Sequence, residues 1–357
     1  MAKPLVTHVL WTLERGGAER MVLDLARELP DLGFDVEVLA AGGGGDMQLD
    51  FEAANIRLTV NTDLQTRLGA VKFLRDAIRK RRPAIWHTHL TPVWAGVAAK
   101  TTFVSPWITT AHGFEPGLSL PQRLSRRAAY RGASHVVCVS EAVRHAIHRQ
   151  YGVAPAKTSV IPPGIDLGRF PPRESHMAGD VPKLVSVGRL SSEKGLDTLF
   201  HALSELLRPW HLTVVGDGPE KAALHRLAEM LGILPRIKFV GAVADPSPYL
   251  RAADLFCMPS HHEGQGMALL EAAASHVPAI ASDLPAMREA FGEQGVTFVT
   301  HQDAEAWRNA IERTLNRYPE ALKRAEAAAE IVEKRYSLDN MVAKHAQLYR
   351  RFFKASL

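Results

Sequence analysis

Cysteine is scarce in this chain of 357 residues, which contains only Cys138 and Cys257. Each lies in a short apolar run, V-V-C-V-S or L-F-C-M-P, of the kind typical of a buried strand. Two isolated thiols provide neither a disulfide framework nor the ligand spacing of a zinc site. We therefore expect both to be free thiols that fill space in a core, in a reducing compartment.

Long hydrophobic runs are also absent. The sequence has no stretch of about 20 uncharged apolar residues, which is the length that a membrane-spanning helix requires. The apolar segment from Leu5 to Leu13 ends at Glu14 and Arg15, and no small-residue cleavage site follows it. The sequence therefore predicts neither a spanning helix nor a secretory signal, and we expect a cytoplasmic location.

Positive charge is concentrated in the first half of the chain. Residues 1–170 carry 21 Lys/Arg and 15 Asp/Glu, whereas residues 171–357 carry 22 and 23. Two basic clusters within expected helices are either solvated helix faces or a surface that attracts anionic lipid or another polyanion. Nucleic acid is not an expected partner, because no aromatic-basic stacking motif or zinc-finger spacing accompanies the charge. The clusters are Arg67, Lys72, Arg75, Arg79, Lys80, Arg81 and Arg82, and then Arg123, Arg126, Arg127 and Arg131.

Short apolar runs alternate with helical patterns along most of the chain, beginning with a strand in V-T-H-V-L-W-T-L and a helix over residues 18–29. Runs that are apolar on both faces and joined by helices predict a parallel sheet covered on both sides. A Pro- and Gly-rich stretch interrupts the pattern, and a second cycle begins beyond it. The sequence thus predicts an α/β protein with two Rossmann-like domains. The expected segments are a first domain over 1–169, a linker over 170–181, a second domain over 182–336, and a C-terminal helix over 337–357 that can return to the first domain.

Gly16 and Gly17 mark the turn from the first strand into the first helix. Adjacent glycines allow a close backbone approach, and the helix start offers unpaired N–H groups to an anion. The motif is not G-x-G-x-x-G, so an ordinary structural turn is the alternative interpretation.

Histidines end two of the expected strands, with His87 and His89 in A-I-W-H-T-H and His112 after W-I-T-T-A. Ligands of open α/β sheets bind beyond the carboxyl ends of the strands, so side chains at these positions face a cleft more often than chance. We take His112 as a candidate for a catalytic-site role, and a purely structural role is the alternative for all three.

Arg189 and Lys194 lie in G-R-L-S-S-E-K-G, directly after the first strand of the second domain. Two fixed cations there can stabilise the charge that a diphosphate leaving group gains as its bond to a sugar breaks. The chain contains no D-x-D triplet, which argues against the divalent-metal clamp of many other glycosyl transfer enzymes. We therefore expect diphosphate binding with neither a metal nor a cofactor, and exposed loop charges are the alternative.

Glu263 and Glu271 are separated by seven residues in E-G-Q-G-M-A-L-L-E, across an expected junction between a loop and a helix. Gly264 and Gly266 leave backbone N–H groups accessible to phosphate or sugar oxygens at the helix start. Glu271 lies about 7.5 Å further along the helix axis, a suitable step from a diphosphate to a ribose. A partly buried carboxylate needs a partner, which is either the ribose hydroxyls or a buried salt bridge.

These motifs, in this order, resemble the retaining GT-B glycosyltransferases with the E-x7-E signature. That group includes enzymes of bacterial lipopolysaccharide, capsule and phosphatidylinositol mannoside synthesis. The resemblance spans nearly the whole chain and includes V-I-P-P-G-I-D, L-T-V-V-G-D-G-P-E and Y-L-R-A-A-D-L-F-C-M-P-S. It implies a GT-B fold of two facing Rossmann-like domains, and transfer of a hexose-like unit from a nucleoside diphosphate sugar to an acceptor hydroxyl, with retention of configuration. From the basic first half of the chain, we expect a saccharide or lipid-linked acceptor and a peripheral contact with the inner face of an anionic membrane.

The resemblance also implies roles for residues of the first domain. Gly16 and Gly17 are expected beside the donor diphosphate and the acceptor, and His112 beside the donor sugar near the reaction centre. Candidates on the acceptor side are Glu19, His87 and His89.

In the second domain, the resemblance implies that Arg189 and Lys194 bind the diphosphate and that Glu263 faces the transferred sugar. Glu271 is expected to hold the ribose, and the loop at Gly241 and Val243 to meet the base. Further donor-binding candidates are Gly264, Gln265, Gly266 and Met267.

Two positions depart from the family pattern and bear on the identity of the sugar and the nucleotide. Gln265 stands where relatives usually carry Phe or another apolar residue, and Ser282-Asp283-Leu284-Pro285 replaces the commoner T-D-x-G-G turn. Two other functions are kept as alternatives: a sugar-nucleotide epimerase and a non-catalytic sugar-nucleotide-binding module.

Overall fold

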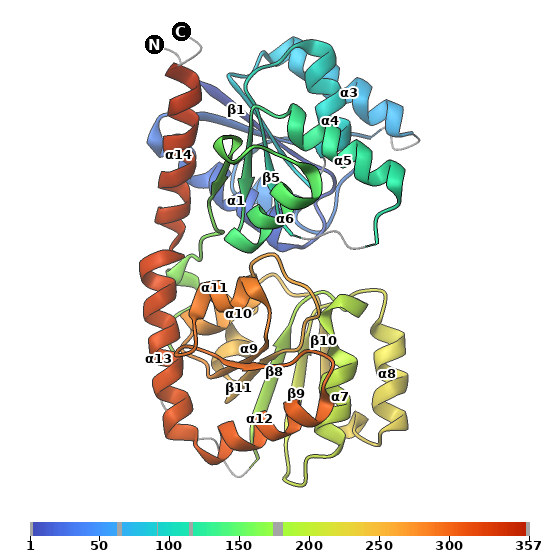
Figure 1. Cartoon of the computed structure of the whole chain (residues 1–357), viewed down its shortest axis with the longest axis vertical. Helices are drawn as coiled ribbons and strands as arrows, with labels where there is room; N and C mark the ends of the chain where they lie inside the picture. Colours follow the sequence, from blue (N-terminus) through green and yellow to red (C-terminus); the bar gives the residue numbers. More distant parts are fainter. Residues whose placement is uncertain (1–2, 63–65, 91, 114–116, 174–180, 355–357) are drawn as a thin grey trace. The chain divides into compact units, whose positions relative to one another are not determined.

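The computed structural model describes residues 3–62, 66–90, 92–113, 117–173 and 181–354 (Figure 1). The chain divides into two compact units. The first unit comprises Met1–Gly164 and Leu338–Leu357, and the second comprises Ile165–Ser337. The C-terminal helix therefore does belong with the N-terminal domain. The division falls at Gly164, ahead of the linker expected over 170–181, of which residues 174–180 lie outside the described residues.

The first unit is built on a seven-stranded parallel sheet with the order β3-β2-β1-β4-β5-β6-β7. Its central strands are apolar and almost fully buried, as the sequence predicts. Two short edge strands, β3 and β7, were not expected, because they are three or four residues long and partly exposed. The strands are β1 (Leu5–Leu10), β2 (Asp35–Ala40), β3 (Arg57–Val60), β4 (Ile85–His89), β5 (Trp107–Ala111), β6 (His135–Cys138) and β7 (Thr158–Val160).

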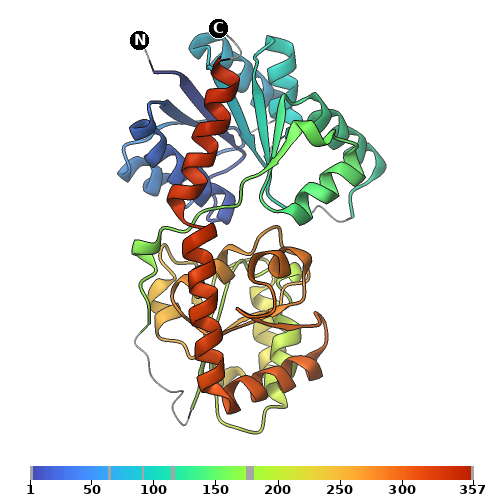
Figure 2. The ribbon, with the colours of Figure 1, turned by 60° about the vertical axis from the view of Figure 1, so that its left-hand side comes forward.

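Helices cover both faces of this sheet (Figure 2). On one face, α1 (Gly17–Glu28), α2 (Gln48–Ala53) and α14 (Leu338–Lys354) share a core that includes Met21, Phe51 and Tyr349. On the other face, a second core includes Trp86 and Trp107. Its helices are α3 (Arg67–Arg81), α4 (Pro92–Thr102), α5 (Leu120–Gly132) and α6 (Glu141–Tyr151).

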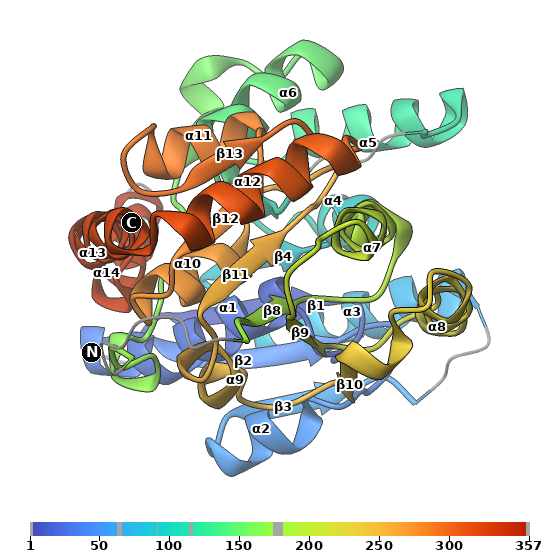
Figure 3. The same cartoon turned by 90° about the horizontal axis from the view of Figure 1, so that it is seen from below.

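The second unit repeats this plan with a six-stranded parallel sheet of order β10-β9-β8-β11-β12-β13, which can be followed in Figure 3. The strands are β8 (Lys183–Val187), β9 (His211–Val215), β10 (Ile237–Gly241), β11 (Leu255–Met258), β12 (Ala279–Ser282) and β13 (Thr297–Val299). One face is covered by α7 (Leu196–Ser204), α8 (Lys221–Met230) and α12 (Ala304–Asn316). The other is covered by α9 (Ser247–Arg251), α10 (Met267–Ala274), α11 (Pro285–Phe291) and α13 (Tyr318–Arg335).

Both cysteines are buried free thiols, as expected, one in a core of each unit. Burial raises the pKa of the Cys138 thiol to about 12, so it stays protonated and unreactive at neutral pH. No helix among the described residues is both long and apolar enough to cross a membrane.

Each sheet has one point at which the strand order reverses, between β1 and β4 in the first unit and between β8 and β11 in the second. At such a point, consecutive loops diverge to opposite faces and leave a crevice beyond the carboxyl ends of the strands. Gly16 follows β1 and His89 ends β4, while Arg189 follows β8 and Glu263 follows β11. The candidate residues of each unit therefore gather at the place where this architecture binds ligands.

Candidate active site

The loop after β8 carries the two expected cations. Arg189 is exposed directly beyond the strand, and Lys194 closes a short 3-10 turn, Ser192–Lys194, that leads into α7. Gly195 follows with a φ of +62°, and an ideal Cβ on it would lie 2.2 Å from the carbonyl oxygen of Pro259. Glycine is therefore required here, because the loop after β8 passes against the loop after β11.

The loop after β11 brings Glu263 to the same place. Lys194 Nζ donates to Glu263 Oε1 at 2.6 Å, and the Ser260 hydroxyl donates to the same oxygen at 2.8 Å. The backbone N–H of His261 also donates to the Glu193 carbonyl at 2.7 Å. The sequence predicted a cation and a carboxylate for one ligand, but not that they would bind each other directly. A hollow at this point is lined by Gly188, Arg189, Lys194 and Ser260.

Glycines open the turn that leads into α10. Gly266, with a φ of +76°, is the N-terminal cap of the helix, and Glu271 lies partly exposed in its second turn. Gln265 is only 4% exposed, so its side chain is buried beside the start of the helix. Gly264 and Met267 are partly buried. The arrangement offers backbone N–H groups at the start of α10, close in sequence to Glu263.

The loops after β8 and β9 touch each other through their backbones. The Gly188 N–H donates to Val215 O at 3.0 Å, and the Leu190 N–H donates to Asp217 O at 2.9 Å. Gly216 lies between these bonds with a φ of +142°, and an ideal Cβ on it would lie 1.8 Å from Gly188 O. On the next strand, Gly241 ends β10 with a φ of +86°, and Val243 is partly buried beyond it.

We expect Gly216→Ala to lower the free energy of unfolding by about 3 kcal/mol, because the new methyl group collides with a backbone oxygen that cannot move aside. Gly232→Ala is the matched control, since Gly232 has a φ of +69° but no atom within 4 Å of its ideal Cβ. That variant should lose about 1–2 kcal/mol from the left-handed backbone alone. Urea unfolding measured by circular dichroism compares the two, and equal losses would contradict the account.

In the first unit, Gly16 is the N-terminal cap of α1 and Gly17 is its first, exposed residue. Glu19 is only 6% exposed, and an ideal Cβ on Gly16 would lie 2.5 Å from Glu19 Oε2. The carboxylate is thus folded back over the helix start, where the helix dipole favours negative charge. Glu19, which the sequence analysis placed on the acceptor side, is therefore buried at the start of α1.

His112 lies partly buried just beyond β5 and is joined to two other histidines. Its Nε2 lies 3.1 Å from Nδ1 of His89, and Nε2 of His89 lies 3.1 Å from Nδ1 of His8. His8 is in the middle of β1, and sequence reasoning missed it. Parallel pairing sets His8 opposite His87 in the sheet. Because alternate residues of a strand face the same side, aligning β1 with β4 would have placed His8, His87 and His89 on one face of the sheet.

His87 and His89, which the sequence analysis placed on the acceptor side, lie in the core of the first unit. Both side chains are fully buried, and both ring nitrogens of each are already hydrogen-bonded. His87 pairs with the Tyr349 hydroxyl at 2.6 Å and with Thr110 Oγ1 at 2.8 Å. A strand that is covered on both faces buries its side chains even at its last residue, and here α14 supplies the cover.

Burial holds these rings in the neutral form. It lowers the pKa of His8 to about 3, with a smaller contribution from His345, and it lowers the pKa of His112 to about 3 in the same way. It also lowers the pKa values of His87 and His89 well below the usual range, assisted by the neighbouring histidines. Each ring therefore has one N–H donor and one acceptor nitrogen at neutral pH.

The side chains of His8, His87 and His89 are close enough to suggest a metal site, since their ligand atoms lie within 4.8 Å of one another. However, five of their six ring nitrogens already have hydrogen-bond partners, and only His8 Nε2 lacks one among the described residues. A metal ligand needs an available lone pair. Among the described residues, the three rings therefore form a hydrogen-bonded network with one another and with Tyr349, Thr110 and His112.

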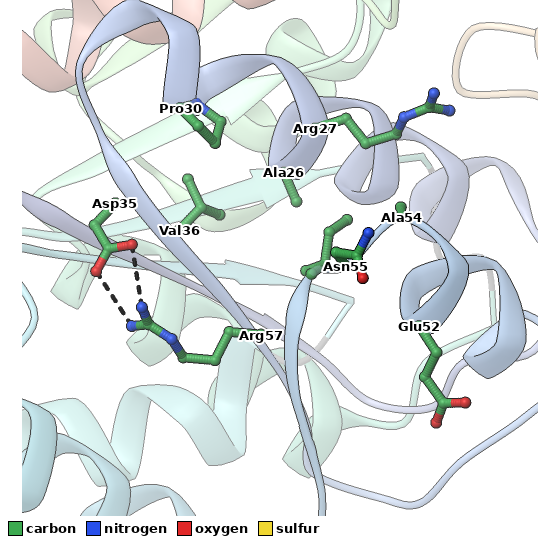
Figure 4. Close-up of a pocket in the computed structure, with 10 residues that line it drawn as sticks. Ala26, Arg27, Pro30, Asp35, Val36, Glu52, Ala54, Asn55 and Arg57 are labelled. Atoms are coloured by element: carbon green, nitrogen blue, oxygen red, sulfur yellow. Dashed lines mark hydrogen bonds and ion pairs between the residues drawn. The ribbon is translucent and has the colours of Figure 1, made fainter.

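A separate hollow of about 550 Å³ lies in the first unit at the opposite ends of the strands (Figure 4). It is bordered by Asp35 and Arg57, which begin β2 and β3 and pair with each other at 3.2 and 3.3 Å. Because it lies at the amino ends of these strands and Asp35 pairs with Arg57, we assign it no role in the site.

Two family models match the chain. The model described as "Glycosyltransferase Family 4" matches residues 15–169, and the one described as "Glycosyl transferases group 1" matches residues 181–317. Among curated relatives, a GDP-mannose-dependent alpha-(1-6)-phosphatidylinositol monomannoside mannosyltransferase of Mycobacterium tuberculosis is 30% identical over 305 residues. This match covers 76% of the chain and 79% of the relative. A lipopolysaccharide core biosynthesis glycosyltransferase of Rhizobium meliloti is 34% identical over 47% of the chain and 50% of the relative.

Solved structures show the same fold. HepE from Anabaena, in complex with UDP and glucose, superposes with a TM-score of 0.87 at 21% identity, covering 98% of this chain and 100% of that one. WaaG, a glycosyltransferase involved in lipopolysaccharide biosynthesis, superposes with a TM-score of 0.79 at 19% identity, covering 96% and 99%. With its two parallel-sheet units and both family matches, the chain belongs to the group 1 and family 4 glycosyltransferases of the GT-B fold.

Proposed function

We propose that the protein transfers a hexose-like sugar from a nucleoside diphosphate sugar to an acceptor hydroxyl, with retention of anomeric configuration. The observation that carries this proposal is the cluster of Arg189, Lys194 and Glu263 at the switch point of the second sheet. This cluster pairs cations for a diphosphate with a carboxylate for sugar hydroxyls. The solved relative that holds UDP and glucose has the same fold, which supports a donor of this class.

In the proposed reaction, the bond between the anomeric carbon and the diphosphate oxygen breaks, and the acceptor oxygen bonds to the same face of that carbon. The acceptor proton passes to the departing diphosphate. Arg189 and Lys194 stabilise the charge that develops there, which is the step at which fixed cations lower the barrier most. Lys194 would exchange its bond to Glu263 for one to phosphate, leaving Glu263 to accept from sugar hydroxyls. Neither Glu263 nor Glu271 serves as a covalent nucleophile in this scheme.

We further propose that Glu271 holds the nucleotide ribose and that no divalent metal takes part. The position of Glu271 in the second turn of α10, beyond the glycine-capped helix start, supports the first point. Incubation of the protein with labelled sugar nucleotide, an acceptor panel and EDTA tests the scheme. An α-linked donor should give an α-linked product by proton NMR of the anomeric signal. A β-linked product, or a strict requirement for added metal, would overturn the corresponding part.

The same incubation without acceptor distinguishes the alternatives. An epimerase would convert the sugar nucleotide to an isomer, whereas a transferase should leave it intact or hydrolyse it slowly. A binding module would bind the donor and form no product with any acceptor.

The acceptor we propose is lipid-linked, at an anionic membrane face. Relatives named for phosphatidylinositol mannoside and lipopolysaccharide synthesis support it, and so does the surface of the first unit. Helix α4 packs between α3 and α5 on one face of the first sheet (Figure 1). Leu68, Leu120 and Leu124 are 78%, 68% and 55% exposed there among the basic residues. Exposed leucines between arginines are typical of helices that lie on anionic bilayers. Arg81, although it lies in the basic cluster of α3, does not contribute to this surface, because its side chain pairs with the buried Glu37.

We expect the protein to bind vesicles that contain anionic lipid at low salt and to dissociate as salt is raised, since each basic side chain contributes about 1 kcal/mol. Arg123→Glu with Arg127→Glu should weaken co-sedimentation at least about ten-fold. The charge-matched control is Arg313→Glu with Lys323→Glu, on exposed positions of the second unit. Equal binding by both double variants, or binding that salt does not weaken, would contradict this surface assignment.

A further inference from the structure

A chain of three imidazole rings runs from the core of the first unit to its candidate site. It begins at His8 in β1, passes through His89 at the end of β4, and ends at His112 beyond β5, with nitrogen-to-nitrogen distances of 3.1 Å at both steps. Each step joins Nδ1 of one ring to Nε2 of the next. Nε2 of His8 and Nδ1 of His112, at the two ends of the row of rings, therefore take no part in these two hydrogen bonds.

The rings must share one direction of donation. A neutral imidazole has one N–H and one lone pair, so His89 can donate to one neighbour only while accepting from the other. Either every ring carries its proton on Nδ1 and donates toward His112, or every ring carries it on Nε2 and donates toward His8. The proton position on His112 is thus fixed by a ring two steps away.

The inner end of the chain decides between the two directions. His8 is fully buried, and its Nε2 has no hydrogen-bond partner among the described residues. If the three rings donated toward His8, its Nε2 would carry a buried N–H without an acceptor. Such a group is rarer in proteins than an acceptor without a donor. The outward direction leaves only a lone pair there.

We propose that His8 and His89 are positioning residues that hold His112 in its Nδ1–H tautomer, so that His112 offers a hydrogen-bond donor to an oxygen of the transferred sugar. The proposal rests on the proposed function for its sugar ligand. The imidazole of His112 then acts as a neutral donor of fixed direction and does not shuttle protons.

Neighbouring side chains further restrain the three hydrogen-bonded histidine rings. The ring of His87 lies against that of His89 with centroids 4.3 Å apart, and His87 is itself held by Tyr349 from α14 and Thr110 from β5. His345, which also comes from α14, directs its Nδ1 to the Met341 carbonyl at 2.9 Å, so this ring satisfies its donor within its own helix. His89 therefore has little room to turn its ring over and exchange its two nitrogens.

The tautomer can be observed directly. We would label the full chain with 15N-histidine and record long-range proton-nitrogen correlations at neutral pH, assigning signals by difference with His8→Gln, His89→Gln and His112→Ala. We expect His8, His89 and His112 to be protonated on Nδ1. Protonation of His112 on Nε2, or exchange between both forms, would overturn the proposal. Tightly bound zinc that is lost from the His8 and His89 variants would also overturn it, because the rings would then be metal ligands.

Kinetics test whether the positioning matters for the reaction. His89→Leu breaks both bonds, and we expect it to lower kcat about 10- to 100-fold with less change in the donor KM, as for other residues that orient a functional group. His89→Gln should restore most of kcat, because an amide can accept from His8 and donate to His112. His135→Gln is the matched control, since His135 is a buried strand histidine that bonds Ser159 outside the chain of rings.

The outcomes separate this inference from the proposed function. A wild-type protein that turns over no nucleotide sugar but keeps His112 protonated on Nδ1 would refute the function and leave the tautomer assignment standing. An active wild type with His112 protonated on Nε2, or with His89→Leu as active as His135→Gln, would refute the inference alone.

Discussion

Replacement of Lys194 or Arg189 by alanine is expected to lower turnover about 10²- to 10³-fold. Loss of one group that stabilises charge in the transition state typically raises the barrier by about 3–4 kcal/mol. Lys194 should have the more complex effect, because its loss also leaves Glu263, whose side chain is only 10% exposed, without its cation. An uncompensated carboxylate at that position would repel the donor diphosphate. The measurement is the steady-state rate of nucleoside diphosphate release with saturating donor.

Lys221→Ala provides the control for this experiment. Lys221 is also a lysine of the second unit in an ion pair, 2.7 Å from Asp217, but that pair is 43% and 48% exposed and begins α8. Its loss should leave turnover unchanged, because exposed pairs contribute little. Near-normal turnover in both Arg189→Ala and Lys194→Ala would remove these residues from the mechanism.

Acid is expected to destabilise the first unit strongly between pH 7 and pH 5. Its fully buried histidines include His8, whose pKa burial lowers to about 3, and His345, whose pKa burial lowers to about 4, together with His87 and His89. In the unfolded chain these groups titrate near 6.5. Below that pH these histidines bind protons in the unfolded chain, whereas in the folded chain they stay neutral. Stability is therefore full above about pH 7 and falls as pH falls, by up to about 2 kcal/mol per buried histidine at pH 5.

His345→Leu tests this linkage with little risk to the site, because the only hydrogen bond of His345 among the described residues goes to the Met341 carbonyl of its own helix. Urea unfolding at pH 7.5, 6 and 5 should show a pH slope that is smaller by about one proton in this variant. Stability that does not change between pH 7.5 and pH 5, or an unchanged slope in His345→Leu, would contradict the neutral state of the cluster.

The architecture could be predicted from the sequence because the signals were local and repeated. Buried parallel strands appear as runs of apolar residues, and the motifs at their carboxyl ends fall where an open sheet binds ligands. This reasoning placed Lys194 and Glu263 at the same end of the second sheet, where the structure joins them by a hydrogen bond. It missed β3, since Arg57–Val60 is short, lies at the edge of the sheet and is only partly buried.

The histidines show what a single sequence conceals. His87 and His89 lie at the end of a strand, as predicted, yet His87 is bonded by Tyr349 of α14, which is 262 residues away along the chain. His8 had no motif to mark it, because its partners come from the sheet register and from β4. Contacts between distant segments decide whether a polar residue faces a ligand or a core, and residue spacing within one motif does not report them.

Donor binding by the second unit is the central claim, and thermal shift measurements test it most directly. Sugars carried on UDP, GDP, ADP, CDP and dTDP would each be added to the wild type, to Lys221→Ala and to Arg189→Ala with Lys194→Ala. We predict that one nucleotide class raises the melting temperature of the first two proteins by several degrees, since ligand at 100 Kd stabilises the folded state by about 2.7 kcal/mol. The double variant should show little or no shift. No shift with any donor at millimolar concentration, or an equal shift in the double variant, would contradict the account.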